Sequence, residues 1–192
     1  MKRALVSTIM GVGLWACGGR ATPSAPVRVA VEKAETAEKA RKHDDARRHY
    51  QAAIATAKDP ASIAFARREF ADTLITWGEY PEATAQLEGV TRASPSDPSA
   101  WHDLGMLYFN RGDAARAIVS LEKARSLAPE DERPRKTLAV IKWKRGDFEG
   151  ARAEYRGMLE LPLPEKTRAS VEWAIADLTK RIAARQSAPA SP

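Results

Sequence analysis

The hydrophobic and polar positions of this chain follow a helical period along most of its length. Between residues 98 and 131 the apolar side chains fall three or four positions apart, in two sets separated by Gly112 and Asp113. Such spacing places each set on one face of a helix, and glycine followed by an acidic residue is typical of one helix ending and the next beginning. The pattern predicts a helical hairpin. Its two sets are Trp101, Leu104, Gly105 and Tyr108, then Ala117, Leu121 and Ala124.

The hairpin pattern recurs with a period of 34 residues. Residues 64–97, 98–131 and 132–165 are copies in register, and residues 27–60 are an earlier copy three positions out of phase. One hairpin cannot bury its own apolar face, so neighbouring copies must stack. After proline breaks at 162 and 164, residues 166–185 carry a single apolar stripe that predicts a capping helix. Residues 186–192 are predicted to be a disordered tail.

The repeat resembles the tetratricopeptide repeat (TPR). That family has Trp, Leu-Gly, Tyr, Ala, an aromatic or leucine, Ala and Pro at fixed places. The resemblance implies an all-α solenoid of about four TPR hairpins with a C-terminal capping helix. In residues 98–131 the places are held by Trp101, Leu104, Gly105, Tyr108, Ala117, Leu121, Ala124 and Pro129.

The N-terminus has the pattern of a targeting segment. Two cations at positions 2 and 3 precede about 13 mostly apolar or small residues, a run too short to span a bilayer as a helix but typical of a secretory signal. The run ends at Cys17, the only cysteine of the chain, so an intramolecular disulfide and a cysteine metal site are both excluded. The alternative is a plain secretory signal in which Cys17 has no role.

Residues 14–17, Leu-Trp-Ala-Cys, resemble the processing site of bacterial lipoproteins, from which Trp15 departs because a small residue is usual there. The resemblance implies that residues 1–16 are a signal peptide and that Cys17 is lipidated, with palmitate among its acyl chains. Residues 17–26 would be the lipidated Cys and a flexible tether. Gly18 in place of aspartate favours the outer membrane, facing the periplasm.

Composition and motifs argue against several functional classes. The net charge of +6 comes from 31 basic and 25 acidic residues, a mixed surface that does not indicate nucleic-acid binding. The three histidines lack a second ligand at helical spacing, so no metal site is expected. No phosphate loop or nucleophile motif is present in the sequence. We therefore expect a protein that is not an enzyme and has no cofactor and no small-molecule substrate.

The TPR resemblance implies a partner-binding groove on the concave face, formed by positions 5, 9, 12 and 13 of each first helix. An apolar stripe would lie beside a basic one, which suits a protein or peptide segment with acidic residues. The alternative is that Ile75, Phe109 and Trp143 are packed between helices. The Lys–Asn pair of the chaperone-tail-binding TPRs is missing. The groove residues are Arg68, Asp72, Ile75, Thr76, His102, Met106, Phe109, Asn110, Lys136, Val140, Trp143 and Lys144.

The functional hypothesis is a membrane-tethered protein–protein interaction scaffold of the bacterial cell envelope. TPR lipoproteins of this kind serve as pilotins, as partners of outer-membrane assembly machines and in motility complexes. Two alternatives stay open: a soluble periplasmic TPR protein that forms homo-oligomers, and an accessory factor of peptidoglycan or polysaccharide enzymes.

Overall fold

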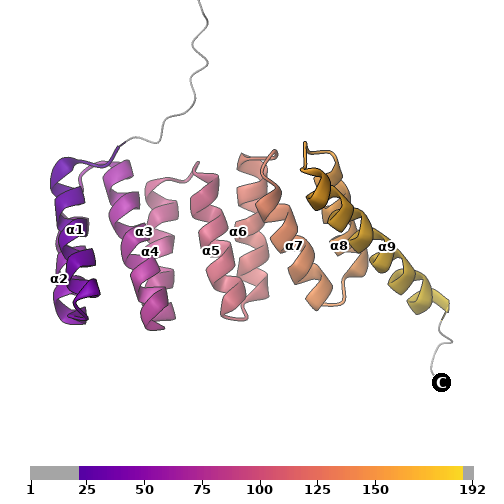
Figure 1. The fold of residues 1–192 in the computed structure, drawn as a ribbon, viewed down its shortest axis with the longest axis horizontal. Coiled ribbons are helices and arrows are strands. Elements are labelled where there is room, and N and C mark those ends of the chain that lie inside the picture. Colours follow the sequence, from indigo (N-terminus) through magenta and orange to yellow (C-terminus); the bar gives the residue numbers. More distant parts are fainter. Residues whose placement is uncertain (1–21, 188–192) are drawn as a thin grey trace, which may run out of the picture.

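The computed structural model describes residues 22–187, so the predictions for the signal peptide, Cys17 and the end of the tail lie outside the described residues. Within residues 22–187 all regular structure is helical, and the helices form antiparallel pairs that stand side by side in one row (Figure 1). The pair formed by α1 and α2 is at one end of the row, and α9 is at the other. This arrangement confirms the predicted all-α solenoid of hairpins.

The helix bounds follow the predicted repeat closely. The first eight helices form four pairs, each joined by a short turn, and a ninth helix follows. The described chain enters α1 two residues before the first predicted copy, and the last helix continues two residues into the predicted tail. The helices are α1 (Ala25–Lys39), α2 (His43–Thr56), α3 (Pro60–Trp77), α4 (Tyr80–Ala93), α5 (Pro98–Asn110), α6 (Ala114–Leu127), α7 (Glu132–Lys144), α8 (Phe148–Leu159) and α9 (Glu165–Ser187).

Glycine occupies the turns of the last three hairpins, as the sequence predicts, whereas Arg41 takes the left-handed conformation in the first. Gly78, Gly112 and Gly146 have φ values of 80°, 81° and 77°, a left-handed conformation that residues with a Cβ rarely adopt. Asp113 and Asp147 then accept a hydrogen bond from a backbone N–H in the first turn of the next helix. In the last two hairpins the capping aspartate therefore fixes where the second helix begins.

The core runs along the array, between the two helices of each hairpin and between neighbouring hairpins. Gly105 allows α5 and α6 to approach closely, because a Cβ on this residue would lie 2.7 Å from Leu121 Cγ. Ala117 and Ala124 on the facing helix are fully buried. Small residues at these places thus set the distance between the helices, and the buried leucines beside them each contribute about 1.5–3 kcal/mol of burial free energy.

The last helix covers the end of the fourth hairpin. Val171, Leu178 and Ile182 on α9 are buried, and α9 packs on α8. These three residues belong to the apolar stripe that predicted a capping helix, so that part of the fold prediction is confirmed. No helix among residues 22–187 is both long enough and apolar enough to cross a membrane.

Candidate peptide-binding face

The predicted groove residues come from the first helices of three successive hairpins, and contacts between helices show that they form one surface. Arg68 Nε on α3 lies 3.3 Å from an Asp103 carboxylate oxygen on α5. Further along, the Lys144 ammonium on α7 lies 4.9 Å from the ring centre of Phe109 on α5, a cation–π contact. We call this surface of α3, α5 and α7 the groove face.

The apolar stripe of the groove face is graded from half-buried to exposed. Ile75 and Phe109 are half-buried and pack against the hydrophobic core. Trp143 occupies the same repeat position on α7 but is 45% exposed. Neither alternative of the sequence analysis therefore describes all three residues. Ile75 on α3 and Phe109 on α5 are partly in the core, whereas Trp143 on α7 is a surface residue.

The expected basic stripe is interrupted in the structure. Arg68 has a side chain only 20% exposed and pairs with both Asp97, at 3.1 Å, and Asp103. His102 is also mostly buried, whereas Lys136 is exposed. Sequence alone could not reveal this, because the two aspartates that neutralise Arg68 follow it by 29 and 35 positions and only the stacking of hairpins brings them close.

The groove face is acidic towards its N-terminal end. Burial raises the pKa of the Asp72 carboxyl, and the nearby Asp103 carboxylate raises it further. Burial also raises the pKa of Glu69, with an added contribution from Asp72. Burial is the larger cause of both shifts, the neighbouring carboxylates add to it, and Arg68 opposes it.

The C-terminal end of the groove face has the opposite character. Lys136 and Lys144 are exposed one turn before and just after the apolar pair Val140 and Trp143. Met106 on the neighbouring helix is half-buried and accepts a weak hydrogen bond from Thr137 Oγ1, at 3.6 Å from its sulfur. The remaining predicted groove residues, Thr76 and Asn110, are exposed at the ends of α3 and α5. This end therefore combines accessible apolar surface with positive charge.

A second tryptophan, on the capping helix, lies beside this end. Trp173 on α9 is 72% exposed and lines a cavity of about 210 Å³ together with Val140, Trp143 and Tyr155. The signal in the sequence was a large aromatic residue on the polar side of a capping helix. Its position next to Trp143 depends on how α9 packs against α8, which the repeat pattern does not specify.

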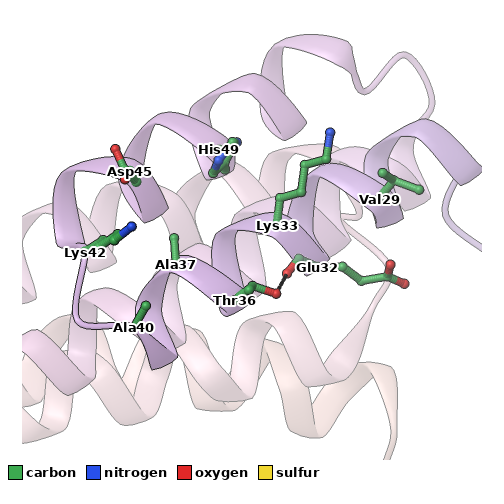
Figure 2. A pocket seen from close by; sticks show the side chains of 9 residues that line it. All are labelled: Val29, Glu32, Lys33, Thr36, Ala37, Ala40, Lys42, Asp45 and His49. Carbon is green, nitrogen blue, oxygen red and sulfur yellow. Dashed lines mark hydrogen bonds between the residues drawn. The ribbon is translucent and has the colours of Figure 1, made fainter.

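Two other hollows lie away from this pair of tryptophans. One, of about 530 Å³, is at the outer end of the row between α1 and α2, where Glu32 and Lys33 point in different directions rather than converging (Figure 2). The other, of about 830 Å³, is lined by Thr22, Pro23 and the first turns of α3. Among residues 22–187 no group of three or more histidine, cysteine, aspartate or glutamate side chains is placed to hold a metal ion.

Comparison with known proteins identifies the repeats. Two tetratricopeptide repeat models match the chain, one over residues 68–132 and the other over residues 108–161. Residues 68–161 are tetratricopeptide repeats. The matched models describe TPR units, which act as protein-interaction modules, and neither is a model of an enzyme family.

Curated relatives share part of this TPR region. A TPR repeat-containing protein of Pseudomonas aeruginosa is 38% identical over 102 residues, which are 53% of this chain and 41% of that protein. Cellulose synthase operon protein C of Escherichia coli K12 is 33% identical over 88 residues, which are 46% of this chain and 8% of that protein. The matched region thus covers less than half of each relative.

Solved structures share the TPR fold at low identity. A MamA protein superposes with a TM-score of 0.62 at 15% identity, covering 86% of this chain and 98% of that one. The first TPR of Spaghetti (RPAP3), bound to an HSP90 peptide, gives a TM-score of 0.55 at 19% identity, over 62% of this chain and 93% of that one. At these identities the likeness establishes the fold.

Proposed function

We propose that this TPR protein is a membrane-tethered scaffold that holds a segment of another protein against the groove face. The observation that carries the proposal is an apolar surface made by the half-buried Met106, Phe109 and Val140 and the exposed Trp143, beside two exposed lysines. Apolar surface with a polar rim is the usual composition of a protein interface. The Spaghetti TPR structure, which contains a bound peptide, supports the same use of the fold here.

The start of the described chain supports a tether on the groove side of the array. The Ser24 backbone N–H donates a hydrogen bond to Ser62 Oγ at 2.9 Å, which fixes the chain beside α3. Thr22 lines the same hollow as Phe65 and Arg68. Cys17 precedes Thr22 by five residues, a span of roughly 17 Å at most. A lipid on Cys17 would therefore hold this end of the groove face close to the bilayer.

The assembly served would then be one at the bacterial envelope, with the outer membrane as the proposed location. A pilotin-like role, a role in outer-membrane assembly and a role in a motility complex all place a partner segment within reach of a short tether. A second candidate, an accessory factor of polysaccharide enzymes, draws on the identity to cellulose synthase operon protein C. Such a factor would pellet with isolated peptidoglycan or cellulose.

Removing the proposed lipid attachment is expected to release the protein from membranes. Cys17→Ser leaves no thiol for acylation, and each acyl CH₂ in the bilayer contributes about 0.8 kcal/mol of anchoring. In the native host, the wild type should sediment with membranes and incorporate labelled palmitate, and the variant should do neither. Ser7→Ala, within the proposed signal peptide, is the matched control. Equal membrane retention of Cys17→Ser and wild type would contradict the anchor.

Removing the apolar groove side chains is expected to abolish partner capture. A photo-crosslinking amino acid at the exposed position of Asn110 should trap a protein in vivo, and Phe109→Ala with Trp143→Ala should reduce that product by at least about tenfold. Val119→Ala removes an exposed apolar residue from α6 and serves as the control. Helical circular dichroism should be unchanged. An undiminished crosslink in the double variant would refute a groove-face interaction.

A further inference from the structure

A furrow between α7 and α9 is the most accessible apolar feature of the groove side. Val140 and Trp143 form one wall, Trp173 and Leu178 form the other, and Tyr155 of α8 lies between them. The cavity of about 210 Å³ adjoins another of about 270 Å³ that shares Tyr155 and extends towards Lys136 and Lys166. We call these two adjoining cavities the C-terminal furrow.

Three of the five cations of α7 pair with carboxylates of this chain. The Lys142 ammonium lies 2.7 Å from a carboxylate oxygen of the buried Glu154, and Arg135 lies 3.6 Å from the other oxygen. Arg133 pairs with Asp131 at 2.6 Å. These three cations are therefore satisfied locally and do not define the charge presented to a partner.

Two lysines that form no ion pair within residues 22–187 line the furrow. Lys136 of α7 and Lys166 of α9 are both exposed, and both line the cavity of about 270 Å³. Arg181 lines the cavity of about 210 Å³ but pairs with Asp177 at 2.6 Å. The charged residues that line the furrow therefore leave it net positive, through Lys136 and Lys166 in the cavity that adjoins the two tryptophans, and their ammonium groups are available to a partner's carboxylates.

We propose that the C-terminal furrow binds a short acidic segment of a partner protein, with one or two large apolar side chains seated between Trp143 and Trp173. This rests on the proposed scaffold function and locates its main contact. Tryptophan in a partly enclosed pocket is the residue type that most often dominates binding energy. The size of each cavity suits single side chains rather than a folded domain.

The other end of the groove face disfavours an acidic segment. Glu69, Asp72 and Asp103 form a negative group around α3 and α5, where burial raises the pKa of Glu69 and Asp72 and the neighbouring carboxylates add to the increase. An acidic segment is repelled there and attracted to Lys136 and Lys166. Charge thus selects the C-terminal furrow over the rest of the groove face.

The test uses the full-length protein in detergent and a labelled synthetic peptide, Ac-EEDFLFEDE, followed by fluorescence anisotropy. The controls are a basic counterpart, Ac-KKRFLFKRK, and Ac-EEDSSSEDE, which lacks the apolar centre. We expect the first peptide to bind and both controls to bind at least tenfold more weakly. Because none of the peptides contains tryptophan, a change in protein tryptophan fluorescence on binding should accompany the anisotropy change.

Substitutions then locate the binding site. Trp173→Ala should weaken binding of Ac-EEDFLFEDE at least tenfold, whereas Tyr80→Ala, which removes an aromatic residue exposed to a similar degree as Trp143, should not. Lys136→Glu with Lys166→Glu should weaken binding and reduce its dependence on salt. Lys33→Glu with Lys123→Glu makes the same change in net charge at exposed sites outside the furrow and should leave binding unchanged.

Several results would overturn the proposal. These are equal or tighter binding of the basic peptide, no binding of any peptide, and wild-type affinity in both furrow variants. A dimer in light scattering that Trp173→Ala dissociates would mean that a second copy covers the furrow instead. If the crosslink from position 110 still depends on Phe109 and Trp143 in any of these cases, the scaffold function stands and the furrow proposal alone fails.

Discussion

Replacing Glu154 with alanine is expected to lower the free energy of unfolding by about 3 kcal/mol. The Glu154 side chain is 4% exposed, and its oxygens lie 2.6 Å from Arg125, 2.7 Å from Lys142 and 3.6 Å from Arg135. These cations come from α6 and α7, so the carboxylate on α8 holds three helices together. Without it, three partly buried cations would face one another with no counter-charge.

Urea denaturation followed by circular dichroism measures this loss. Glu149→Ala is the matched control, because Glu149 is an exposed carboxylate on the same helix and its removal should change the unfolding free energy by no more than about 0.5 kcal/mol. Glu154→Gln keeps the shape and should fall between the two. The network has no structural importance if Glu154→Ala is as stable as Glu149→Ala.

The contribution of Glu154 to the free energy of unfolding should also depend on pH. Burial raises the pKa of its carboxyl, but hydrogen bonds from Lys142 and Arg125 outweigh burial and leave the pKa below its ordinary value. A carboxyl with a lowered pKa in the folded state stabilises the protein above its unfolded pKa, about 4.3, and loses this effect as the pH falls through the folded pKa. The stability difference between wild type and Glu154→Gln should therefore be constant near neutral pH and shrink below about pH 4.

The same carboxylate shapes the surface of α7. Glu154 holds Arg135 and Lys142 in ion pairs, whereas Lys136 and Lys144 of the same helix are exposed. A buried charge network thus separates the structural cations of one helix from those that a partner can reach. The sequence shows five cations on α7 and gives no sign of this division.

The sequence predicts the features of the fold that are local. Gly78, Gly112 and Gly146 recur every 34 residues, and each sits in a turn that requires a left-handed backbone. The period of apolar residues predicts the helices and the small residue at Gly105 predicts a close approach. All of these depend on neighbours within one hairpin, which is why they can be predicted without the structure.

The candidate site depends instead on how hairpins pack against each other. Phe109 and Trp143 hold the same repeat position, yet Phe109 is half-buried and Trp143 is 45% exposed. Arg68 looked like a free cation and is paired by two aspartates from the next hairpin. Trp173 belongs to a helix outside the repeat pattern. The repeat gives the position of each residue on its helix, but exposure and pairing come from helices distant in sequence.

Replacing Phe70 with alanine is the other substitution expected to have a large effect, about 3–4 kcal/mol of unfolding free energy. Phe70 on α3 is fully buried and its ring stacks on Tyr50 of α2 at 5.0 Å between centroids. The Arg47 guanidinium lies 5.7 Å from the Phe70 ring centre. This cluster joins the first hairpin to the second, so its loss uncouples the N-terminal end of the array.

The Phe70→Ala substitution is expected to destabilise only the helices near it. In a solenoid each hairpin contacts only its neighbours, so stability is roughly a sum of local terms. Hydrogen exchange in Phe70→Ala should show lost protection in α1, α2 and α3 with protection retained in α7, α8 and α9. Phe65→Ala, at a half-buried position one turn earlier on α3, should lose less. Because the C-terminal furrow lies in the protected end, Phe70→Ala should still bind the acidic peptide, and loss of protection throughout all helices would instead show that the array unfolds as a single unit.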